Sequence, residues 1–522
     1  MPITIQNTAG GGVTLDSTTT ANETVNLPTG GGNLITTTGA TFTGNIATAG
    51  ISSVTAGTSN FVAGVNAGNS ITSGGNYNTV VGDEAGTALT TGGQNVAVGM
   101  NAMVGQTTAS YNVAVGQAAL SANTTGANTT AVGWNSLTAN TTGASNTAVG
   151  SSALGANTTG GDITALGYNA LRFNTTGGDN VAVGTEALTA NTTGGQNVAV
   201  GRQSLKSNTT ASNNTALGNY SLFYNTTGGD NTAVGRSALE DNTTGSANTA
   251  VGMGSLESNT TGTLSTAIGR DALKSSTTAN SNTAVGREAL RDTTTGGENV
   301  AIGLNAMAGN TTGPRNTAIG KQCLQNLTTG DNNTAIGFMA GYNNNTNATT
   351  TGYGNTLIGT YAHTNAANTQ YANALGQSIG ASGGYTTLGS GGSDIRASHG
   401  STTWSTVSDE RYKKDITTST AGLSFVNELR PVTWNYKTLG ELPTTFSAYE
   451  ADSTEVFKNT QTNHGFIAQE VKAVIDNHSE IKDGFRLWDD REDGSQEVAE
   501  AALIPVLVKA IQELSTQNAA LA

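Results

Sequence analysis

The sequence predicts a mainly β protein, in which a long β-solenoid is followed by a smaller α+β domain. Three observations predict it: a repeat of seventeen residues, two apolar columns that keep the phase of that repeat, and an abrupt change of composition near residue 408. Of the 522 residues, 70 are glycine and only 5% are aromatic, which leaves too little apolar material for one large core. Burial must therefore come from repetition and association.

Charge and composition argue against several classes of partner. The formal net charge is −14 and no basic patch is visible, so we expect neither nucleic acid nor an anionic membrane surface as a partner. The start "MPITIQNTAGGG" does not resemble a signal peptide, and no apolar run approaches the ~18 residues of a membrane helix, so we expect a soluble chain made in the cytoplasm with no membrane insertion. Cys323 is the single cysteine, which excludes an internal disulfide and argues against structural zinc. No cofactor is expected.

The repeat is anchored by a glycine. "NTAVGRSALEDNTTGSA" begins at Asn231, and "NTAVGMGSLESNTTGTL" follows at Asn248. The central glycine recurs every seventeen residues from Gly82 to Gly337, and the pattern continues after a five-residue insertion. A disordered Gly/Thr/Asn-rich chain would have no reason to keep this phase. We therefore predict a stacked solenoid over residues 77–341.

Each repeat is expected to contain two short β-type segments separated by the glycine bend, and then a polar "NTTG" turn. Val, Ile or Leu precedes each glycine, as at Val81 and Val234, and Leu follows four residues after it in most copies, as at Leu239. We predict that these two columns form the core and that the Ala column, two residues before the glycine, lies on the other face. Aspartate at Val234 should then be costly, whereas a change of Asn242 in the turn should be tolerated. Cys323 falls in an Ala/Ser column and is expected to be a small buried residue.

The array resembles the "NxAxG" β-roll repeats of trimeric autotransporter adhesin heads and of phage tail fibres. In those proteins three parallel rolls pack about a threefold axis, so the resemblance implies a homotrimer. Residues 1–76 alternate weakly between Gly-rich turns and resemble the amino-terminal parts of some tail fibres, which implies a β-rich virion-attachment region. Over 342–407 the repeat becomes irregular and aromatic residues are frequent. We expect a solenoid cap there, with receptor contact as the alternative.

From Ser408 onward the sequence is that of an ordinary globular domain with mixed charge. "GLSFVNELRPVTWNY" predicts a short helix followed by a strand, and "HGFIAQEVKAVIDNH" predicts a helix. "LIPVLVKAIQELSTQNAALA" predicts a final helix with Pro505 in its first turn or at a kink. Its apolar seam has heptad spacing, which favours a self-associating coiled coil over simple packing; the seam consists of Ile504, Leu507, Ile511, Leu514, Asn518 and Leu521.

A serine and a lysine at the start of this domain form a candidate catalytic pair. A serine hydroxyl is a weak nucleophile until a base accepts its proton, and a lysine amine can be that base where its surroundings favour the neutral form. Ser408 and Lys413 lie five residues apart in "SDERYKKDI", and Arg411 and Lys414 would supply neighbouring positive charge. From these residues alone, a solvated charged turn at a domain start is the simpler interpretation.

Three motifs that follow one another along the chain favour the catalytic pair over the solvated turn. They are "SDERYKKDI", "HGFIAQEV" and "LIPVLVKAIQEL". Together they closely resemble the self-cleaving intramolecular chaperone domain of phage tailspikes and endosialidases, a peptidase family with a Ser-Lys dyad. The resemblance covers about 408–522 and implies that the domain trimerises, templates the fibre and cuts the chain between Val407 and Ser408. It assigns Ser408 as nucleophile and Lys413 as base. His464 lies in the second motif, shortened here, and either orients the site or is structural.

The leading interpretation is a trimeric phage tail fibre that is made in the host cytoplasm and resides in the virion. Its N-terminal region would bind tail or baseplate proteins, and its shaft would meet a glycan or protein receptor on the host surface. A bacterial trimeric adhesin is the first alternative and would be expected to show a secretory signal and an anchor barrel. A capsule-depolymerising tailspike would show clustered carboxylates. Membrane-tethered eukaryotic transcription factors with a similar protease would show a membrane helix and a DNA-binding domain.

Overall fold

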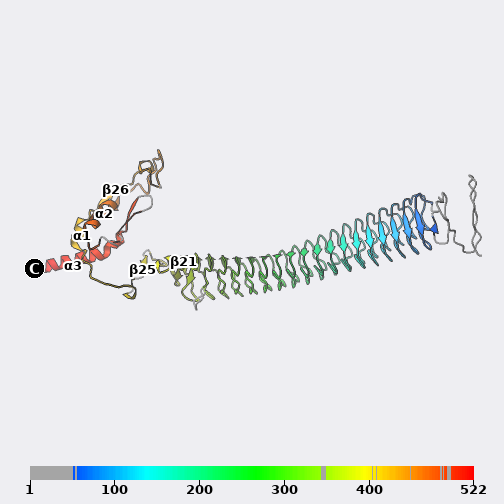
Figure 1. Cartoon of the computed structure of the whole chain (residues 1–522), viewed down its shortest axis with the longest axis horizontal. Coiled ribbons are helices and arrows are strands. Elements are labelled where there is room, and N and C mark those ends of the chain that lie inside the picture. The colour runs from blue at the N-terminus through cyan, green and yellow to red at the C-terminus, as the bar shows by residue number, and fades with distance from the viewer. Residues whose placement is uncertain are drawn as a thin grey trace, which may run out of the picture. The chain divides into compact units, whose positions relative to one another are not determined.

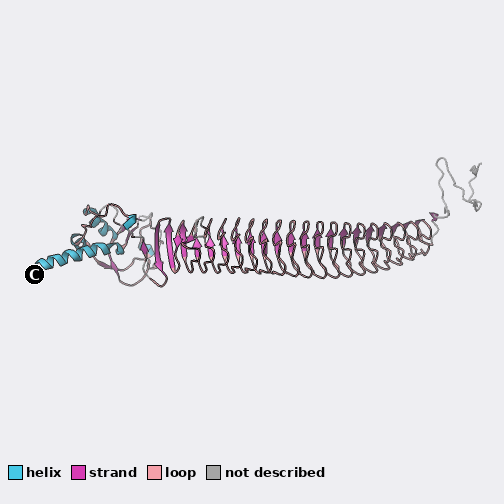
Figure 2. Cartoon of the chain, turned by 90° about the horizontal axis from the view of Figure 1, so that it is seen from below, coloured by secondary structure: helices cyan, strands magenta, loops and turns pink. Residues whose placement is uncertain are grey.

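The computed structural model divides the chain into two compact units, Met1–Val407 and Ser408–Ala522 (Figures 1 and 2). The predicted virion-attachment region, 1–76, lies for the most part outside the described residues. The structure describes residues 51–52, 56–342, 349–401, 404–406, 408, 410–446, 448–481, 485, 487–490 and 495–521.

The first unit is a β-solenoid in which each turn adds one short strand to a long parallel sheet (Figure 2). Neighbouring strands pair in register one repeat apart, as where Ala199 lies opposite Ala216. This confirms the predicted solenoid and its seventeen-residue spacing. The three-residue strands are β2 (Phe61–Ala63), β3 (Thr79–Val81), β4 (Val96–Val98), β5 (Val113–Val115), β6 (Thr130–Val132), β7 (Thr147–Val149), β8 (Thr164–Leu166), β9 (Val181–Val183), β10 (Val198–Val200), β11 (Thr215–Leu217), β12 (Thr232–Val234), β13 (Thr249–Val251), β14 (Thr266–Ile268), β15 (Thr283–Val285), β16 (Val300–Ile302), β17 (Thr317–Ile319), β18 (Thr334–Ile336) and β19 (Thr356–Ile358).

Both ends of the stack include antiparallel strands. β1 (Ile51–Ser52) pairs antiparallel with β2. At the other end β21 (Asn373–Gln377) and β23 (Tyr385–Ser390) continue the parallel stack, and β24 (Ser393–Ser398) and β25 (Ser405–Thr406) then fold back antiparallel. A small separate sheet joins β20 (His363–Thr364) to β22 (Gly380–Ala381).

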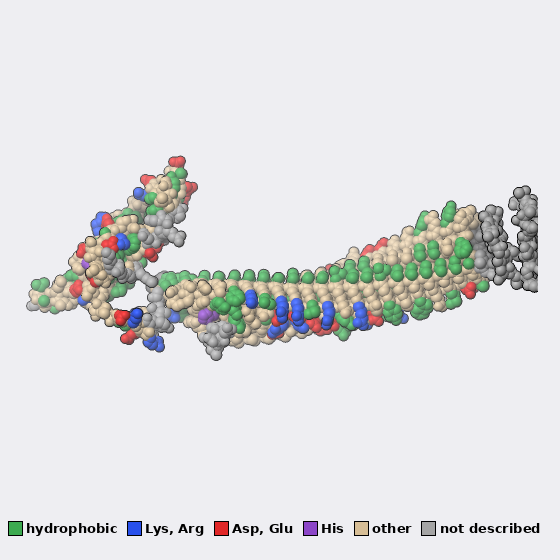
Figure 3. Space-filling view, in the orientation of Figure 1, with side chains coloured by type: hydrophobic (Ala, Val, Ile, Leu, Met, Phe, Trp, Pro, Cys, Tyr) green, Lys and Arg blue, Asp and Glu red, His purple; other side chains and the backbone are tan. Residues whose placement is uncertain are grey.

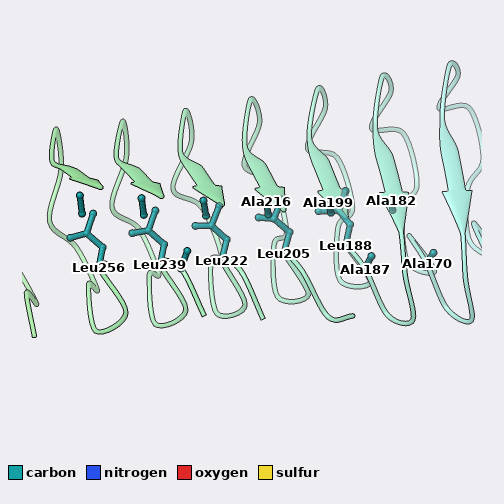
Figure 4. Packing of buried hydrophobic residues seen from close by; sticks show 14 of the residues in the cluster. Ala170, Ala182, Ala187, Leu188, Ala199, Leu205, Ala216, Leu222, Leu239 and Leu256 are labelled. Carbon is teal, nitrogen blue, oxygen red and sulfur yellow. The ribbon is translucent and has the colours of Figure 1, made fainter. Parts of the chain in front are cut away.

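The two faces of each strand are reversed relative to the prediction. The middle residue of the strand, usually alanine, is fully buried, as at Ala233, whereas the residue before the glycine is partly exposed, reaching 41% at Ile268. The leucine column is buried as predicted, including Leu239. Figure 3 shows rows of hydrophobic side chains along the outside of the array, and Figure 4 shows the alanine and leucine columns facing each other inside it. The interior is narrow, so the strand position that faces a leucine admits a methyl group and little more.

Two turns at the start of the solenoid, both without the leucine, show that the two columns share one volume. Val62 and Val80 replace the strand alanine in the two turns where Gly68 and Gly86 replace the leucine. A Cβ atom on Gly68 would lie 3.3 Å from a methyl group of Val62, and one on Gly86 would lie 3.2 Å from a methyl group of Val80. A larger strand residue is therefore matched by a missing side chain opposite it.

The segment after the glycine is a series of turns rather than the second strand that we predicted. Residues two and four positions after the glycine adopt left-handed backbone conformations, as at Ser237 (φ 56°) and Leu239 (φ 53°). A roll that closes within seventeen residues has to bend sharply here, and positive φ values supply those bends even at residues that rarely adopt them. Each regular turn up to Gly337 accordingly holds a single strand, and a second strand appears only in the turns that contain β20 and β22.

The asparagine of the "NTTG" turn is buried, so the basis for expecting Asn242 to tolerate change is wrong. Asn242 is fully buried, and its Nδ2 donates to Asn225 Oδ1 (2.8 Å) and to the Gly245 carbonyl (2.9 Å). A second asparagine column lies four residues before the glycine, where the backbone N–H of Asn248 donates to Asn231 Oδ1 (3.0 Å). A narrow roll brings its turns inside, and their polar groups need partners there.

The outward column makes an apolar stripe along the array. Contiguous apolar surface of this length is uncommon on monomeric proteins and usually marks an interaction surface. We call it the Val/Ile/Leu stripe. Its members that are 36–41% exposed are Val115, Val149, Leu166, Val200, Leu217, Ile268, Ile302, Ile319, Ile336, Ile358 and Leu375.

In the described part of the second unit, three helices and one β-hairpin pack around Phe425, which is fully buried, and a second antiparallel pair joins strands that are distant in the chain. The helix and strand predicted over "GLSFVNELRPVTWNY" are α1 (Leu423–Glu428) and β26 (Val432–Trp434), and Pro505 lies in the first turn of α3 (Ile504–Leu521), as expected. The elements are η1 (Glu410–Tyr412), α1 (Leu423–Glu428), β26 (Val432–Trp434), η2 (Leu439–Glu441), β27 (Asn463–Gly465), α2 (Ala468–Asn477), β28 (Trp488–Asp490), β29 (Gln496–Val498), η3 (Glu500–Leu503) and α3 (Ile504–Leu521).

Candidate active site

A single helical turn brings Lys413 to Ser408. η1 lies between the two residues, and the backbone N–H of Lys413 donates to the Glu410 carbonyl at 2.9 Å, which closes the turn. Lys413 Nζ then donates to Ser408 Oγ at 2.8 Å. The pair that the sequence singled out is therefore in direct contact, and one short element sets its geometry.

Both members of the pair are exposed in the single chain. An amine at hydrogen-bond distance from a serine hydroxyl can take its proton when neutral and return it later. Water stabilises the charged form of any lysine, so a base of this kind works best where water is excluded. The described residues bring the pair together, but the single chain leaves it open to solvent.

The other predicted site residues lie at different places. Arg411 is exposed and belongs to η1, between the two members of the pair. His464 is exposed on β27, opposite Thr433 of β26, and no hydrogen bond or ion pair among the described residues joins it to Ser408 or Lys413. Val407, the residue before the predicted cleavage point, lies outside the described residues.

The boundary between the two compact units falls at the predicted cleavage bond. The first unit ends at Val407 and the second begins at Ser408. Cutting that bond would separate the solenoid from the second unit without breaking any element of either. The serine of the pair is thus the first residue of the unit that would be released.

Other candidates for chemistry are weak. Cys323 is fully buried with its Sγ 3.2 Å from the Ala335 carbonyl, and burial raises the pKa of its thiol to about 12. A thiol with so high a pKa is a poor nucleophile, and the predicted burial is confirmed. Within the described ranges, no group of three or more His, Cys, Asp or Glu side chains forms a metal-type cluster. None of the helices described is both long and apolar enough to cross a membrane.

α3 has two different faces. Val506 and Ala510 are buried against the unit, and Glu513 Oε2 accepts a hydrogen bond from the Leu423 N–H at the start of α1 (2.8 Å). The heptad seam is exposed, from 41% at Leu507 to 86% at Leu521. The seam that the sequence identified is therefore not used for packing within this chain.

The apolar stripe is the surface that sequence reasoning misplaced. A signal for it was present, because Ala and Val alternate along each strand and successive residues of a strand point to opposite faces. Alanine in every second position, as at Ala233 beside Val234, marks the crowded side. Hydrophobicity alone favoured the larger residue for the interior.

Comparison with known proteins addresses the second unit directly. Residues 408–480 match the family described as the chaperone of endosialidase. The chaperone-of-endosialidase match begins at Ser408, includes Lys413 and His464, and ends before α3. The family is one of self-cleaving intramolecular chaperones, and its presence behind a β-solenoid fits a tail fibre or tailspike with a C-terminal chaperone. The chain matches no curated protein and no solved structure.

Proposed function

We propose that this protein is a phage tail fibre, in which a trimeric solenoid shaft adsorbs to the host surface. The second unit would drive trimerisation and folding and then cut itself off before Ser408. The observation that carries the proposal is the 2.8 Å contact between Lys413 Nζ and Ser408 Oγ, at the first residue of the region that matches the chaperone family. The fibre would be made in the host cytoplasm and reside in the virion, attached to the tail through residues 1–76.

The proposed cleavage uses the serine that directly follows the scissile bond. Ser408 Oγ attacks the Val407 carbonyl carbon while Lys413 takes the hydroxyl proton, which it then gives to the departing amide nitrogen of Ser408. The result is an ester between the Val407 carbonyl and Ser408 Oγ, with the Ser408 amine free. Water hydrolyses the ester, leaving a carboxylate on Val407 and restoring the Ser408 hydroxyl. No separate substrate pocket is needed, because substrate and nucleophile are adjacent in the chain.

Three exposed features support assembly before cleavage. The Ser408–Lys413 pair is open to solvent, the heptad seam of α3 is unpacked, and the Val/Ile/Leu stripe of the solenoid is uncovered in one chain. A second and third copy of the chain would cover the seam as a coiled coil and the stripe as a common core. Exclusion of water from the pair by neighbouring chains would then start the reaction only after assembly.

The cleavage is tested by expressing the wild type, Ser408→Ala, Lys413→Ala and the control Lys437→Ala, which removes an exposed lysine of the second unit outside the candidate site, in one host. Wild type and Lys437→Ala should yield a fragment that begins at Ser408, identified by mass spectrometry after a denaturing gel. Ser408→Ala and Lys413→Ala should remain full length. Cutting of either alanine variant at the same bond would show that another protease acts there.

Assembly is tested with a charge in the seam. Ile511→Asp places a carboxylate in the proposed coiled-coil core, whereas Gln512→Asp places it on a neighbouring exposed position of the same helix. In a Ser408→Ala background, light scattering should give about three times the 52.5 kDa chain mass for Gln512→Asp. Ile511→Asp should give little folded trimer. Equal yields of trimer from both variants would remove the seam from the proposal.

A further inference from the structure

One side of the solenoid differs from turn to turn. It is formed by the residues one, two, five and six positions after each repeat glycine, which we call the variable face. Nine of the ten Lys and Arg residues between 77 and 341 lie on it, the exception being Arg315. The stripe, by contrast, keeps Val, Ile or Leu in every turn. Contact between identical chains along a whole shaft needs the same chemistry in each turn. The stripe therefore fits the surface between the chains of the proposed trimer, and the variable face fits its solvent-exposed surface.

Aromatic residues are concentrated in one stretch of the variable face. Five of the seven aromatic residues between Gly99 and Gly337 fall within residues 168–224. Their rings are accessible, with Tyr168 53% exposed and both Phe173 and Tyr224 49% exposed. We define the aromatic–cationic patch as Tyr168, Arg172, Phe173, Arg202, Lys206, Tyr220, Phe223 and Tyr224.

Each cation of the patch lies against a ring. The guanidinium carbon of Arg172 is 5.1 Å from the ring centre of Phe173, and that of Arg202 is 5.7 Å from the ring centre of Tyr220. Lys206 Nζ lies 5.6 Å from the ring centre of Phe223. These contacts hold the cations beside the exposed ring of Phe173 and the partly exposed rings of Tyr220 and Phe223 without neutralising them.

The charge of the patch is opposite in sign to that of the chain. On the variable face between residues 168 and 224, Arg172, Arg202 and Lys206 outnumber the single acid Glu186, giving three minus one, or +2, in a chain of net charge −14. Glu186 is paired with Lys206 (2.8 Å). Within the described stretch 56–342, neither Arg172 nor Arg202 forms an ion pair. Two guanidiniums therefore remain available for an anionic ligand.

Later turns of the same face show that this excess is local. Lys274 is paired with Glu257 and Asp271, and Arg291 is paired with Glu288 and Asp292. Between residues 225 and 341 the variable face carries six Lys or Arg residues and six Asp or Glu residues, so its formal charge there is six minus six, or zero.

We propose that the aromatic–cationic patch binds an acidic polysaccharide of the host surface. Exposed rings offer flat apolar faces for sugar rings, and the unpaired guanidiniums can bind carboxylate or phosphate groups of the polymer in a bidentate manner. Phe173 and Tyr224 lie three turns apart, or about 14 Å at about 4.8 Å per strand, which suits an extended polymer rather than one sugar. This inference rests on the proposed adsorption function and names its ligand class.

The array supplies its own conservative replacements for a test. Other turns have Ala139 or Ser207 at the register of Phe173 and Tyr224, so Phe173→Ala and Tyr224→Ser repeat solutions that the fold already uses. Arg172→Thr follows Thr189, and Arg202→Thr follows Thr185 in the same way. The four changes together make the patch variant. The control is Trp134→Ser, which removes an exposed aromatic residue of the variable face outside the patch and follows Ser151.

Binding of the full chain is measured on immobilised polygalacturonate, alginate and hyaluronan, with dextran and pullulan as neutral polymers. Wild type and Trp134→Ser should bind at least one acidic polymer, and added salt should weaken that binding. The patch variant should bind at least about tenfold more weakly, which corresponds to the loss of one or two ring and guanidinium contacts. Equal binding by the patch variant, binding of neutral polymers alone, or binding of none of these polymers would overturn the proposal.

Two further measurements separate this inference from the proposed function. If the patch variant adsorbs to bacterial cells as well as wild type does, the patch is not the ligand site, although adsorption stands. If wild type adsorbs to no strain of a broad panel, the proposed function itself fails. The patch variant should also keep the native mass of the wild type, since loss of the trimer would assign the patch to contact between copies of the chain.

Discussion

The side-chain amide of Asn242 donates a hydrogen bond of 2.8 Å to the side-chain oxygen of Asn225, one turn earlier in the solenoid. Each asparagine of this column except the last, Asn259, accepts from one neighbouring turn and donates to the other, so the column forms a second line of hydrogen bonds beside the parallel sheet. All of it is buried, where hydrogen bonds are strong and unpaired polar groups are costly. The unbroken links join Asn123, Asn140, Asn157, Asn174, Asn191, Asn208, Asn225, Asn242 and Asn259.

Removing one amide should weaken the solenoid measurably. Asn242→Ala leaves the Asn225 side-chain oxygen and the Gly245 carbonyl without this donor, and Asn259 without its acceptor. We expect a loss of about 1–3 kcal/mol in the free energy of unfolding, measured by denaturant titration of the full chain. Thr244→Ala, in the same turn but exposed, should change it little. Similar losses at the two positions would mean that the column carries no net stability.

The column is interrupted at two turns, and repairing it should stabilise the protein. Ser276 and Thr293 occupy the asparagine register there, and the buried Asn259 Oδ1 and Ser276 Oγ have no hydrogen-bond partner among the described residues. In the double variant Ser276→Asn/Thr293→Asn, each new side-chain amide should donate to the residue one turn earlier and accept from the residue one turn later, as the asparagines of other turns do. We expect a gain of about 1–2 kcal/mol in the free energy of unfolding. Thr278→Asn, at an exposed position of the same turn, is the control, and an equal gain there would contradict the ladder as the cause.

Much of the shaft was predictable because the repeat period is visible in the sequence. The spacing from Gly82 to Gly337 required a stack, and the buried leucine column followed from its regularity. The assignment of Val234 to the inside failed because sequence gives the polarity of a residue but not the width of the interior, which only Ala233 fits. Asn242 was misjudged for the same reason, because a polar turn is external in most folds but internal in a roll this narrow.

The candidate site was predictable in part. Ser408 and Lys413 followed from their motif, and their contact depends on the short turn η1, which the sequence did not reveal. The second motif, "HGFIAQEV", also indicated His464. Among the described residues, His464 forms no hydrogen bond to Ser408 or Lys413. Shared motifs identify residues that act in one family, whereas their spatial grouping depends on local geometry and on any neighbouring chains.

The shared volume of the alanine and leucine columns can be tested by a double-mutant cycle. Ala233→Val overfills a turn that holds Leu239 and should cost about 1–3 kcal/mol. Leu239→Gly alone empties the same space and should also destabilise. The pair together recreates the Val80–Gly86 arrangement, so the double variant should lose at least about 1 kcal/mol less than the sum of the single losses. The control is Val234→Leu, which repeats the outward-facing Leu217 of the preceding turn. Strictly additive losses in the cycle would show that residues 233 and 239 are independent.

His478 should make the stability of the second unit depend on pH. The ring is buried against Phe425, its Nδ1 lies 2.9 Å from Glu480 Oε1, and its Nε2 lies 3.2 Å from Glu428 Oε1. The hydrogen bond to Glu480, followed by that to Glu428, raises the pKa of His478 against the opposing effect of burial. The hydrogen bond from His478 in turn lowers the pKa of Glu480.

The direction of the pH effect follows from these two shifts. Because the folded state holds the imidazolium more tightly than the unfolded chain, its stabilisation is complete below the ordinary histidine pKa of about 6.5 and is lost as the pH rises through the raised pKa of folded His478. The contribution of Glu480 is lost at the acid end, as the pH falls through its lowered pKa. Calorimetry of the full chain should show the melting temperature of the second unit falling as the pH rises from the range in which His478 is protonated to the range in which it is neutral. His478→Gln should flatten the dependence of this melting temperature on pH. The control His464→Gln, at an exposed histidine, should leave the dependence intact. An unchanged slope in His478→Gln would assign the effect to other groups.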